Sequence, residues 1–184
     1  MKKILAVIPV REKSSRLKNK NIKRLCGHEL FLWTYQFAKE TKLINNIIIS
    51  TESKKILNIA KKYGYKNNYL RKKSLSKKNV RNIRTVIDVV NYEKKNLREY
   101  DYVLLLHCTS PIRVKNSLNN ALKNFYKSKC DSAVSVSQGI KKKDNFICEI
   151  KNNNLKIQEN NFYKKKLHFS NAAIYITKPE LLKK

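Results

Sequence analysis

Glycine is scarce in this chain, and its placement excludes two common nucleotide-binding loops. The 184 residues include three glycines, and none precedes Gly27. The first apolar run, Ile4 to Pro9, is therefore followed by neither a G-x-x-x-x-G-K-[ST] phosphate loop nor a G-x-G-x-x-G turn. This absence disfavours P-loop kinases and Rossmann dehydrogenases.

Acidic residues are also few, and the excess of basic residues raises the possibility that the protein binds nucleic acid. Lys and Arg number 42 against 13 Asp and Glu, which gives a formal net charge of +29 and a pI near 10.1. Clustered cations would indicate a phosphate backbone as partner. The lysines instead run almost evenly from Lys2 to Lys184. A solvated basic surface is therefore favoured over a nucleic-acid interface, which stays as the weaker alternative.

Long apolar stretches and paired cysteines are missing as well. No run approaches the ~20 residues that span a bilayer, and Arg11 interrupts the first apolar segment before any cleavage-like site. Cys26, Cys108, Cys130 and Cys148 form no C-x-x-C pair and have no His at metal-ligand spacing. We expect a cytoplasmic protein with no membrane segment, no zinc site and no disulfide framework.

The apolar pattern predicts strands that alternate with helices. The length suits one domain. Apolar runs of strand length occupy Ile4–Pro9, Ile47–Ser50, Asp101–His107, Ser132–Ser137 and Ala172–Thr177. Helical spacing occupies Leu30–Lys39, Ser53–Lys62, Arg84–Lys95 and Leu118–Phe125, and a last short helix begins at Pro179.

Local signals refine this pattern into a fold. Ser53 is a plausible N-cap of the second helix and Gly64 a plausible stop. The stretches FICEI and LKIQE, separated by KNNN, predict an antiparallel hairpin near residues 146–159. The sequence therefore predicts an α/β domain with three layers, a mostly parallel Rossmann-like sheet and a projecting β-hairpin.

The loop from Arg11 to Asn21 follows the first predicted strand and is rich in cations and hydroxyls. In open α/β sheets ligands bind at the carboxyl ends of the strands, which is the place of this loop. Arg, Lys and Ser side chains together suit phosphate oxygens. A polyphosphate site and a solvated basic loop are both compatible with this chemistry.

The motif P-x-R-x-x-S-x-R-L-x-x-K-N, spelled by Pro9, Arg11, Ser14, Arg16, Leu17, Lys20 and Asn21, resembles a known signature. It is similar to the start of the cytidylyltransferases that activate keto sugar acids, namely the acylneuraminate (CMP-sialic acid) synthetases and the related CMP-KDO synthetases. Later stretches support the resemblance in the same order: LCGHELFLWT (25–34), IIISTES (47–53), YLR (69–71), LLLHCTSPIR (104–113) and SNAAIYIT (170–177). The resemblance implies the nucleotide-diphospho-sugar transferase fold in a single domain over residues 1–184.

The resemblance also implies a set of functional residues. The implied contacts of CTP are Arg11, Ser14, Ser15, Arg16, Lys20, Asn21, Arg71 and Asn82. Arg11 and Lys20 are the implied catalytic residues, because they would neutralise the charge that develops on the leaving oxygen. The implied contacts of the sugar acid are His107, Thr109, Ser110 and Asn171.

The implied reaction transfers CMP from CTP to a sialic-acid-like or KDO-like acid and releases pyrophosphate. Such catalysis depends on positioning and on charge neutralisation, with Mg²⁺ as cofactor. The resemblance further implies a homodimer paired through an element at about residues 140–170, and a role in lipopolysaccharide or capsule biosynthesis.

Metal ligands are not identified in the sequence. Mg²⁺ needs carboxylates, and the D-x-D pair of the family follows the strand that matches Ala172–Thr177, in a stretch that this chain lacks. Glu52, Asp88 and Asp101 are interpreted as surface or capping residues. Three alternatives remain open: an active enzyme, a catalytically inactive CTP or CMP-sugar binder, and a fragment of a longer protein.

Overall fold

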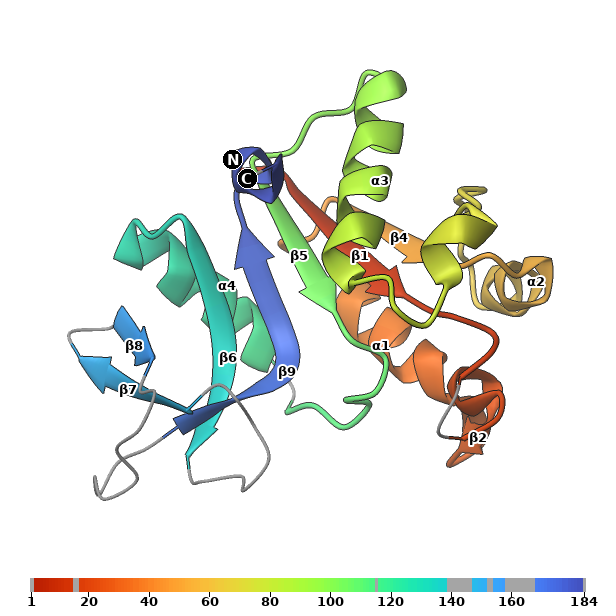
Figure 1. Cartoon of the computed structure of the whole chain (residues 1–184), viewed down its shortest axis with the longest axis horizontal. Helices are drawn as coiled ribbons and strands as arrows, with labels where there is room; N and C mark the ends of the chain where they lie inside the picture. Colours follow the sequence, from red (N-terminus) through yellow and green to blue (C-terminus); the bar gives the residue numbers. More distant parts are fainter. Residues whose placement is uncertain are drawn as a thin grey trace.

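The chain forms nine strands and four α-helices in the residues that its computed structural model describes, which are 2–14, 17–114, 116–138, 147–151, 154–157 and 168–183 (Figure 1). The strands are β1 (Ile4–Pro9), β2 (Arg24–Leu25), β3 (His28–Glu29), β4 (Asn46–Ser50), β5 (Tyr102–Leu106), β6 (Ser132–Gln138), β7 (Ile147–Lys151), β8 (Asn154–Ile157) and β9 (His168–Thr177). The helices are α1 (Leu30–Lys39), α2 (Lys54–Lys62), α3 (Asn82–Lys95) and α4 (Ser117–Ser128), with 3-10 turns η1 (Lys20–Ile22), η2 (Lys73–Ser76) and η3 (Pro179–Lys183).

One mixed sheet organises the molecule. Its order is β4-β1-β5-β9-β7-β8, and β6 also pairs with β9. Strands β4, β1 and β5 are parallel, whereas β9 is antiparallel to both β5 and β6. Strand β6 therefore runs in the direction of β5, and the predicted mostly parallel α/β sheet is confirmed with β9 inserted in the opposite direction.

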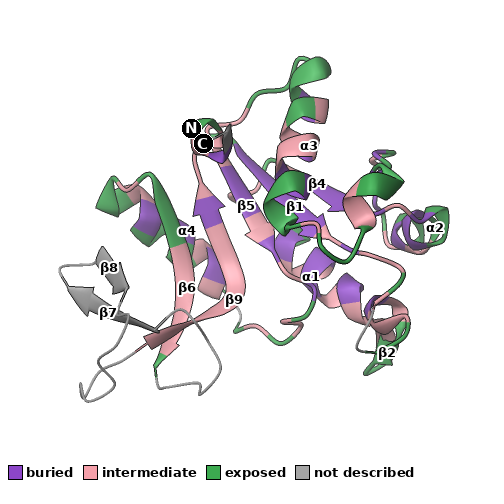
Figure 2. Cartoon of the chain, in the orientation of Figure 1, coloured by how far each residue is buried: buried purple, intermediate pink, exposed green. Residues whose placement is uncertain are grey.

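Alternation along β1 divides the core into two layers of side chains. Ile4, Ala6 and Ile8 pack with α1, α2 and α4 on one face of the sheet, and Leu5 and Val7 pack with α3 and η3 on the other. All five side chains are inaccessible to solvent. Figure 2 shows this buried band running through the central strands between the helices. The three predicted layers follow from a strand that is apolar on both faces.

The predicted helix signals are confirmed, whereas the short turns η1 and η2 and one small hairpin were not predicted. Ser53 Oγ accepts the backbone N–H of Ile56 at 3.4 Å, so it caps α2, and Gly64 ends the helix with a φ of +85°. The unpredicted hairpin is formed by β2 and β3, and its turn residues Cys26 and Gly27 both have positive φ. Its two-residue strands are too short to produce a periodic pattern.

The parallel strands end at one edge of the sheet, and this edge gathers three segments that are distant in sequence. Pro9 of β1 is in register with Ser50 of β4, and the N–H of Val10 donates to the carbonyl of Ser50 at 2.8 Å. Residues that follow β1, β4 and β5, among them Arg11, Glu52 and His107, therefore lie at the same edge.

The hairpin predicted near residues 146–159 is present as β7 and β8, which pair antiparallel and lie at the end of the sheet remote from α1 (Figure 1). Strand β7 joins the sheet through the first residues of β9. In the described part of the chain, no helix has the length and apolar character needed to cross a bilayer.

Candidate functional site

The loop that follows β1 is closed by side chains within it. Ser14 Oγ donates to the carbonyl of Leu17 and accepts the backbone N–H of Lys20 at 2.8 Å. Asn21 Nδ2 donates to the carbonyl of Arg11 at 2.7 Å. The backbone of the loop is therefore folded back on itself, with Ser14 and Asn21 holding its two ends.

Asn21 also connects the loop to the end of β5. Its side chain is buried, and its Oδ1 accepts from Cys108 Sγ at 3.3 Å, while the same sulfur lies 3.6 Å from the carbonyl oxygen of Pro9. Burial raises the pKa of the Cys108 thiol to about 11. Because nucleophilic chemistry needs the thiolate, Cys108 serves here as a packed donor.

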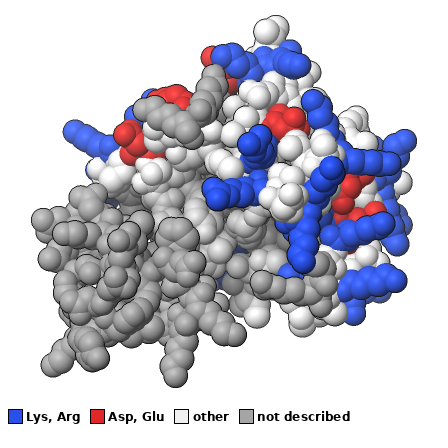
Figure 3. All heavy atoms as spheres, in the orientation of Figure 1, with Lys and Arg blue, Asp and Glu red and all other residues white. Residues whose placement is uncertain are grey.

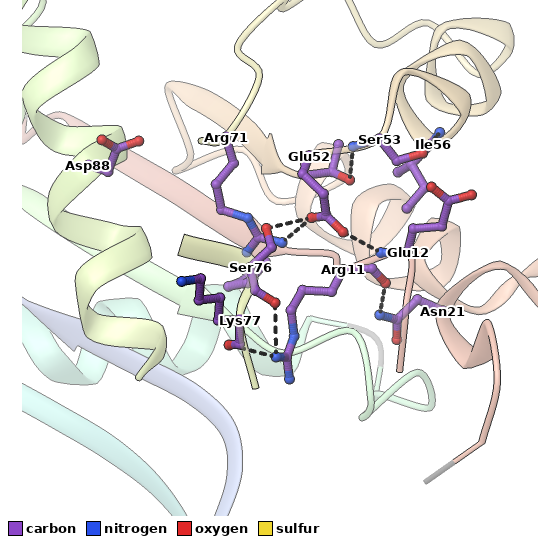
Figure 4. A network of polar contacts seen from close by, with 12 residues as sticks. Arg11, Glu12, Asn21, Glu52, Ser53, Ile56, Arg71, Ser76, Lys77 and Asp88 are labelled. Carbon is purple, nitrogen blue, oxygen red and sulfur yellow. Dashed lines mark hydrogen bonds and ion pairs between the residues drawn. The ribbon is translucent and has the colours of Figure 1, made fainter. Parts of the chain in front are cut away.

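Glu52, the second residue after β4, is the polar centre of the site (Figure 4). Its Oε1 accepts the backbone N–H of Glu12 at 3.0 Å. Its Oε2 accepts Arg71 Nη2 at 2.6 Å and Ser76 Oγ at 2.9 Å. The side chains of Glu52 and Arg71 are 16% and 1% exposed. The interpretation of Glu52 as a surface or capping residue was therefore wrong, because one carboxylate fastens three segments together.

The environment of Glu52 favours its ionised form. Burial by itself would raise the pKa of this carboxyl, but the hydrogen bonds from Arg71, two backbone N–H groups and Ser76 outweigh burial and lower the pKa below its ordinary value. A carboxyl whose folded-state pKa is lowered stabilises the fold above its ordinary pKa of about 4.3. This contribution is lost as the pH falls through the lowered pKa.

Arg11 and Lys20, the predicted catalytic cations, both lie at this edge. The half-buried Arg11 points toward η2, where its Nη1 donates to the carbonyls of Lys77 at 3.2 Å and Ser76 at 3.5 Å. A guanidinium carries five N–H donors. Among the described residues only Nη1 of Arg11 has hydrogen-bond partners, which leaves the N–H groups of Nε and Nη2 available to a ligand. Lys20 begins η1 in the same loop, and its backbone N–H donates to Ser14 Oγ at 2.8 Å.

Arg71 and Asn82, the more distant predicted nucleotide contacts, differ in access. Arg71 is buried against Glu52, and its Nε has no hydrogen-bond partner among the described residues. Asn82 is the exposed first residue of α3. Both assignments stay predictions, as do those of Ser15 and Arg16, which lie outside the described residues.

The predicted contacts of a sugar acid begin at the end of β5. The half-buried His107 ring meets the ring of Tyr175 edge to face, with 5.8 Å between centroids. Burial, followed by the charge of Arg113, lowers the pKa of His107, so the imidazole is neutral near pH 7 and offers one donor and one acceptor. Thr109 is exposed, and the N–H of Ser110 donates to the carbonyl of His107 at 3.3 Å.

Asn171, the remaining predicted sugar contact, takes part in the pairing of β9 with β6. Its Oδ1 accepts the hydroxyl of Ser135 and, at 3.1 Å, the N–H of Ala173, while its Nδ2 donates to Ser137 Oγ at 3.1 Å. The register between the two strands shifts at this place. Asn171 therefore reinforces an irregular stretch of the sheet, and its contact with substrate stays a prediction.

Arg113 connects the end of β5 to β9. It lies in the stretch LLLHCTSPIR, but no function was predicted for it from the sequence. Its Nη2 donates to the carbonyl of His107 at 2.9 Å and its Nη1 to that of Ala173 at 3.1 Å. The guanidinium carbon lies 5.2 Å from the centroid of the Phe37 ring. No carboxylate in the described part of the chain pairs with Arg113. Burial lowers its pKa to about 10, so it remains a cation near pH 7.

The described residues do not fit a divalent metal ion. Among them, no group of three or more His, Cys, Asp or Glu side chains could hold one. At the site itself, both oxygens of Glu52 already accept hydrogen bonds. The described geometry instead suits a polyanion, because cations and neutral donors converge on one sheet edge.

The roles of Glu52 and Arg113 were not predicted from the sequence, for two different reasons. Glu52 is the second residue after a predicted strand, as Arg11 is, so the rule that singled out Arg11 could also have found it. Arg113 lies in the irregular segment between β5 and α4, whose path no periodicity fixes. Only the folded chain brings its guanidinium to His107 and Ala173.

Comparison with protein families identifies one match that spans almost the whole chain. A family described as Cytidylyltransferase matches residues 5–183. The CMP-N,N'-diacetyllegionaminic acid synthase of Legionella pneumophila is 37% identical over 135 residues, which are 73% of this chain and 58% of that protein. A pseudaminic acid cytidylyltransferase of Campylobacter jejuni is 30% identical over 123 residues, which are 67% of this chain and 53% of that protein. The chain thus spans little more than half the length of these relatives.

A solved structure supports the fold. A CMP:2-keto-3-deoxy-manno-octonic acid synthetase complexed with CTP superimposes with a TM-score of 0.76 at 15% identity. The superposition covers 98% of this chain and 76% of that chain. At this identity the likeness concerns the arrangement of strands and helices.

The first prediction concerns the Glu52–Arg71 pair. Glu52→Gln should lower the free energy of unfolding at pH 7 by about 3 to 5 kcal/mol, because it leaves the guanidinium of Arg71 buried without its charge partner. The difference from wild type should shrink as the pH falls below the ordinary carboxyl pKa of about 4.3, and it should disappear once the pH is below the lowered pKa of Glu52 in the folded protein. Urea denaturation across this pH range measures both effects. Ser76→Ala, which removes one hydrogen bond, should cost about 1 kcal/mol; a Glu52→Gln cost no larger than this would contradict the assignment.

The second prediction concerns Arg113. Arg113→Gln should speed hydrogen exchange in residues 107–112 and 171–175 while leaving β1 and β4 unchanged, because two half-buried carbonyls lose their charged donor. Exchange read by mass spectrometry measures this, with the exposed Lys123→Gln as the control of equal charge change. Unchanged exchange at both segments would contradict the bridging role.

Proposed function

The chain belongs to the cytidylyltransferase family, and on that premise we propose that it transfers CMP from CTP to an acidic keto sugar and releases pyrophosphate. The observation that carries the proposal is the closed loop Arg11–Asn21 at the carboxyl end of β1, which brings Arg11 and Lys20 to one sheet edge. The relatives named for legionaminic and pseudaminic acid favour a sialic-acid-like substrate over KDO.

In the proposed reaction the anomeric hydroxyl of the sugar acid attacks the α-phosphorus of CTP. A new oxygen–phosphorus bond forms, the bond to the β-phosphate oxygen breaks, and pyrophosphate leaves with the electron pair while the hydroxyl proton passes to solvent. Arg11 and Lys20 neutralise the charge on the leaving group. Ser14 and Asn21 hold the loop in place, and the neutral His107 offers a hydrogen bond that orients the sugar acid.

The resemblance to the family implies Mg²⁺, but the described residues do not fit this ion. The Glu52 carboxylate is occupied by its three hydrogen-bond donors, and the described chain has no other acidic cluster at the edge. The roles proposed for Arg11 and Lys20 therefore do not depend on a bound metal ion.

A second candidate is a protein that binds CTP or a CMP-sugar without turnover. The lack of a metal-binding carboxylate group among the described residues favours it. A nucleic-acid-binding protein is less favoured, because Lys and Arg side chains are spread over several elements of the visible face with Asp and Glu among them (Figure 3).

The third prediction tests the activity and its loop. The chain should release pyrophosphate from CTP when given a sialic-type acid or KDO with Mg²⁺, whereas a silent binder would bind CTP without turnover. Arg11→Ala should weaken CTP binding at least about tenfold, because a hydrogen bond to a charged group contributes about 1.5 to 3 kcal/mol. Calorimetric titration measures the affinity, with the exposed Lys42→Ala as control. Unchanged CTP affinity in Arg11→Ala would mean that the loop is assigned wrongly.

The fourth prediction concerns assembly. The resemblance implies a homodimer paired through an element at about residues 140–170, and we propose that this pairing occurs in the cytoplasm, where CTP is made. Light scattering on a sizing column should give twice the chain mass of 21.7 kDa at micromolar concentration. A monomer at that concentration would contradict the proposed dimer.

A further inference from the structure

A basic rim borders the proposed nucleotide site, in the segment from Lys72 to Arg84. This segment has no acidic residue. Six of its side chains are cationic and exposed: Lys72, Lys73, Lys77, Lys78, Arg81 and Arg84. None of the six takes part in an ion pair within the described part of the chain. Their positive charges are therefore not neutralised by an ion pair with any described residue, and they can attract an anion that approaches the site.

The rim is fastened to the site by its backbone. The carbonyls of Ser76 and Lys77 accept from Arg11, and the hydroxyl of Ser76 donates to Glu52, so this part of the rim lies directly against the loop after β1 (Figure 4). The carbonyl of Lys77 also accepts the N–H of Val80 at 3.2 Å, which turns the chain toward α3. Two carboxylates border the rim, and both have partners: Glu52 is paired with Arg71, and Asp88, one turn after Arg84 in α3, accepts the hydroxyl of Tyr69.

The start of α3 adds positive charge where a helix ordinarily disfavours it. The N-terminus of a helix carries a partial positive charge, which acidic residues stabilise and cations destabilise. The first turn of α3 has no acidic residue, and its N-cap, Arg81, makes no side-chain capping bond. Arg84 is in the same turn. An approaching anion relieves this local repulsion.

Other lysines of the chain do not share this placement. Lys61 and Lys62 lie in the last turn of α2, and Lys95 lies in the last turn of α3, where the helix dipole favours cations. The fourteen residues of α3 separate Lys95 from Arg81 by roughly 20 Å. This exceeds the Debye length of about 10 Å at 0.1 M salt, so Lys95 contributes little to the field at the site.

We propose that the basic rim is an electrostatic capture surface for free polyphosphates, which attracts the nucleoside triphosphate and later delays the departing pyrophosphate. The proposal rests on the proposed function and deepens it, because it assigns the entry of the nucleotide to residues outside the phosphate loop. Cations beside a binding cleft raise the local concentration of an anionic ligand and its association rate. The expected ligand is a compact anion of high charge density, because the cations of the rim are confined to one short segment beside the loop.

The test compares two triple variants with the same loss of charge. Lys77→Gln/Lys78→Gln/Arg81→Gln removes part of the rim and leaves the carbonyls that hold Arg11 in place. Lys61→Gln/Lys62→Gln/Lys95→Gln removes three exposed cations at the C-terminal ends of α2 and α3. Stopped-flow measurements with a fluorescent CTP analogue and with inorganic triphosphate as competitor give the association rate constants, from about 0.02 to about 0.5 M NaCl.

The rim variant should associate with CTP about tenfold more slowly than wild type at low salt, and the difference should vanish at high salt. At 0.1 M salt the control variant should differ from wild type by less than about twofold, since the roughly 20 Å between Lys95 and Arg81 exceeds the Debye length of about 10 Å and Lys61 and Lys62 lie outside the rim. Equal slowing in both variants would overturn the proposal, because net charge alone would then be responsible. Unchanged rates in the rim variant would overturn it as well.

The two ligands separate this inference from the proposed function. Inorganic triphosphate that binds in a rim-dependent manner, without any binding of CTP, would uphold the rim and refute the cytidylyltransferase proposal. Rim-independent binding of CTP would uphold the function and refute the rim. Binding of neither polyphosphate, or preferential rim-dependent binding of duplex DNA, would overturn the capture of free polyphosphates.

Discussion

The buried ion pair between Glu52 and Arg71 is the interaction on which the site depends. Taking both charges out of water is costly, and the geometry offsets this cost through a 2.6 Å contact and through further donors from Ser76 and the backbone of Glu12. These donors belong to the loop after β1, to the segment between α2 and η2, and to η2 itself, whereas Glu52 follows β4. One carboxylate thus fixes how the loop after β1 sits against its neighbours.

At the carboxyl edge of the sheet, the cationic side chains are positioned by neutral carbonyl groups as well as by Glu52. Arg11 rests on two backbone carbonyls, and the loop that carries Lys20 is closed by Ser14 and Asn21. Arg113 is held in the same manner, by the carbonyls of His107 and Ala173. Cations fixed in this way need little rearrangement when an anion arrives, which is the condition for electrostatic stabilisation of a charged transition state.

Much of the fold could be predicted because its signals are local. The apolar run of β1, the helical spacing of α1 and the cap at Ser53 each reside in a few consecutive residues. The sequence motif after β1 and the rule for strand ends also placed Arg11 and Lys20 at the carboxyl edge. What escaped prediction depends on distant partners: the antiparallel course of β9, the pairing of Glu52 with Arg71, and the two carbonyls that Arg113 bridges. Periodicity and propensity carry no information on such contacts.

The central claim is that the loop after β1, held in shape through Glu52, grips the triphosphate of a cytidine nucleotide. A crystal structure of the chain soaked with CTP tests it most directly. The account predicts phosphate density within hydrogen-bonding distance of Arg11 and Lys20, with the Glu52–Arg71 pair intact beneath the loop. Triphosphate density at any other place on the protein would contradict it.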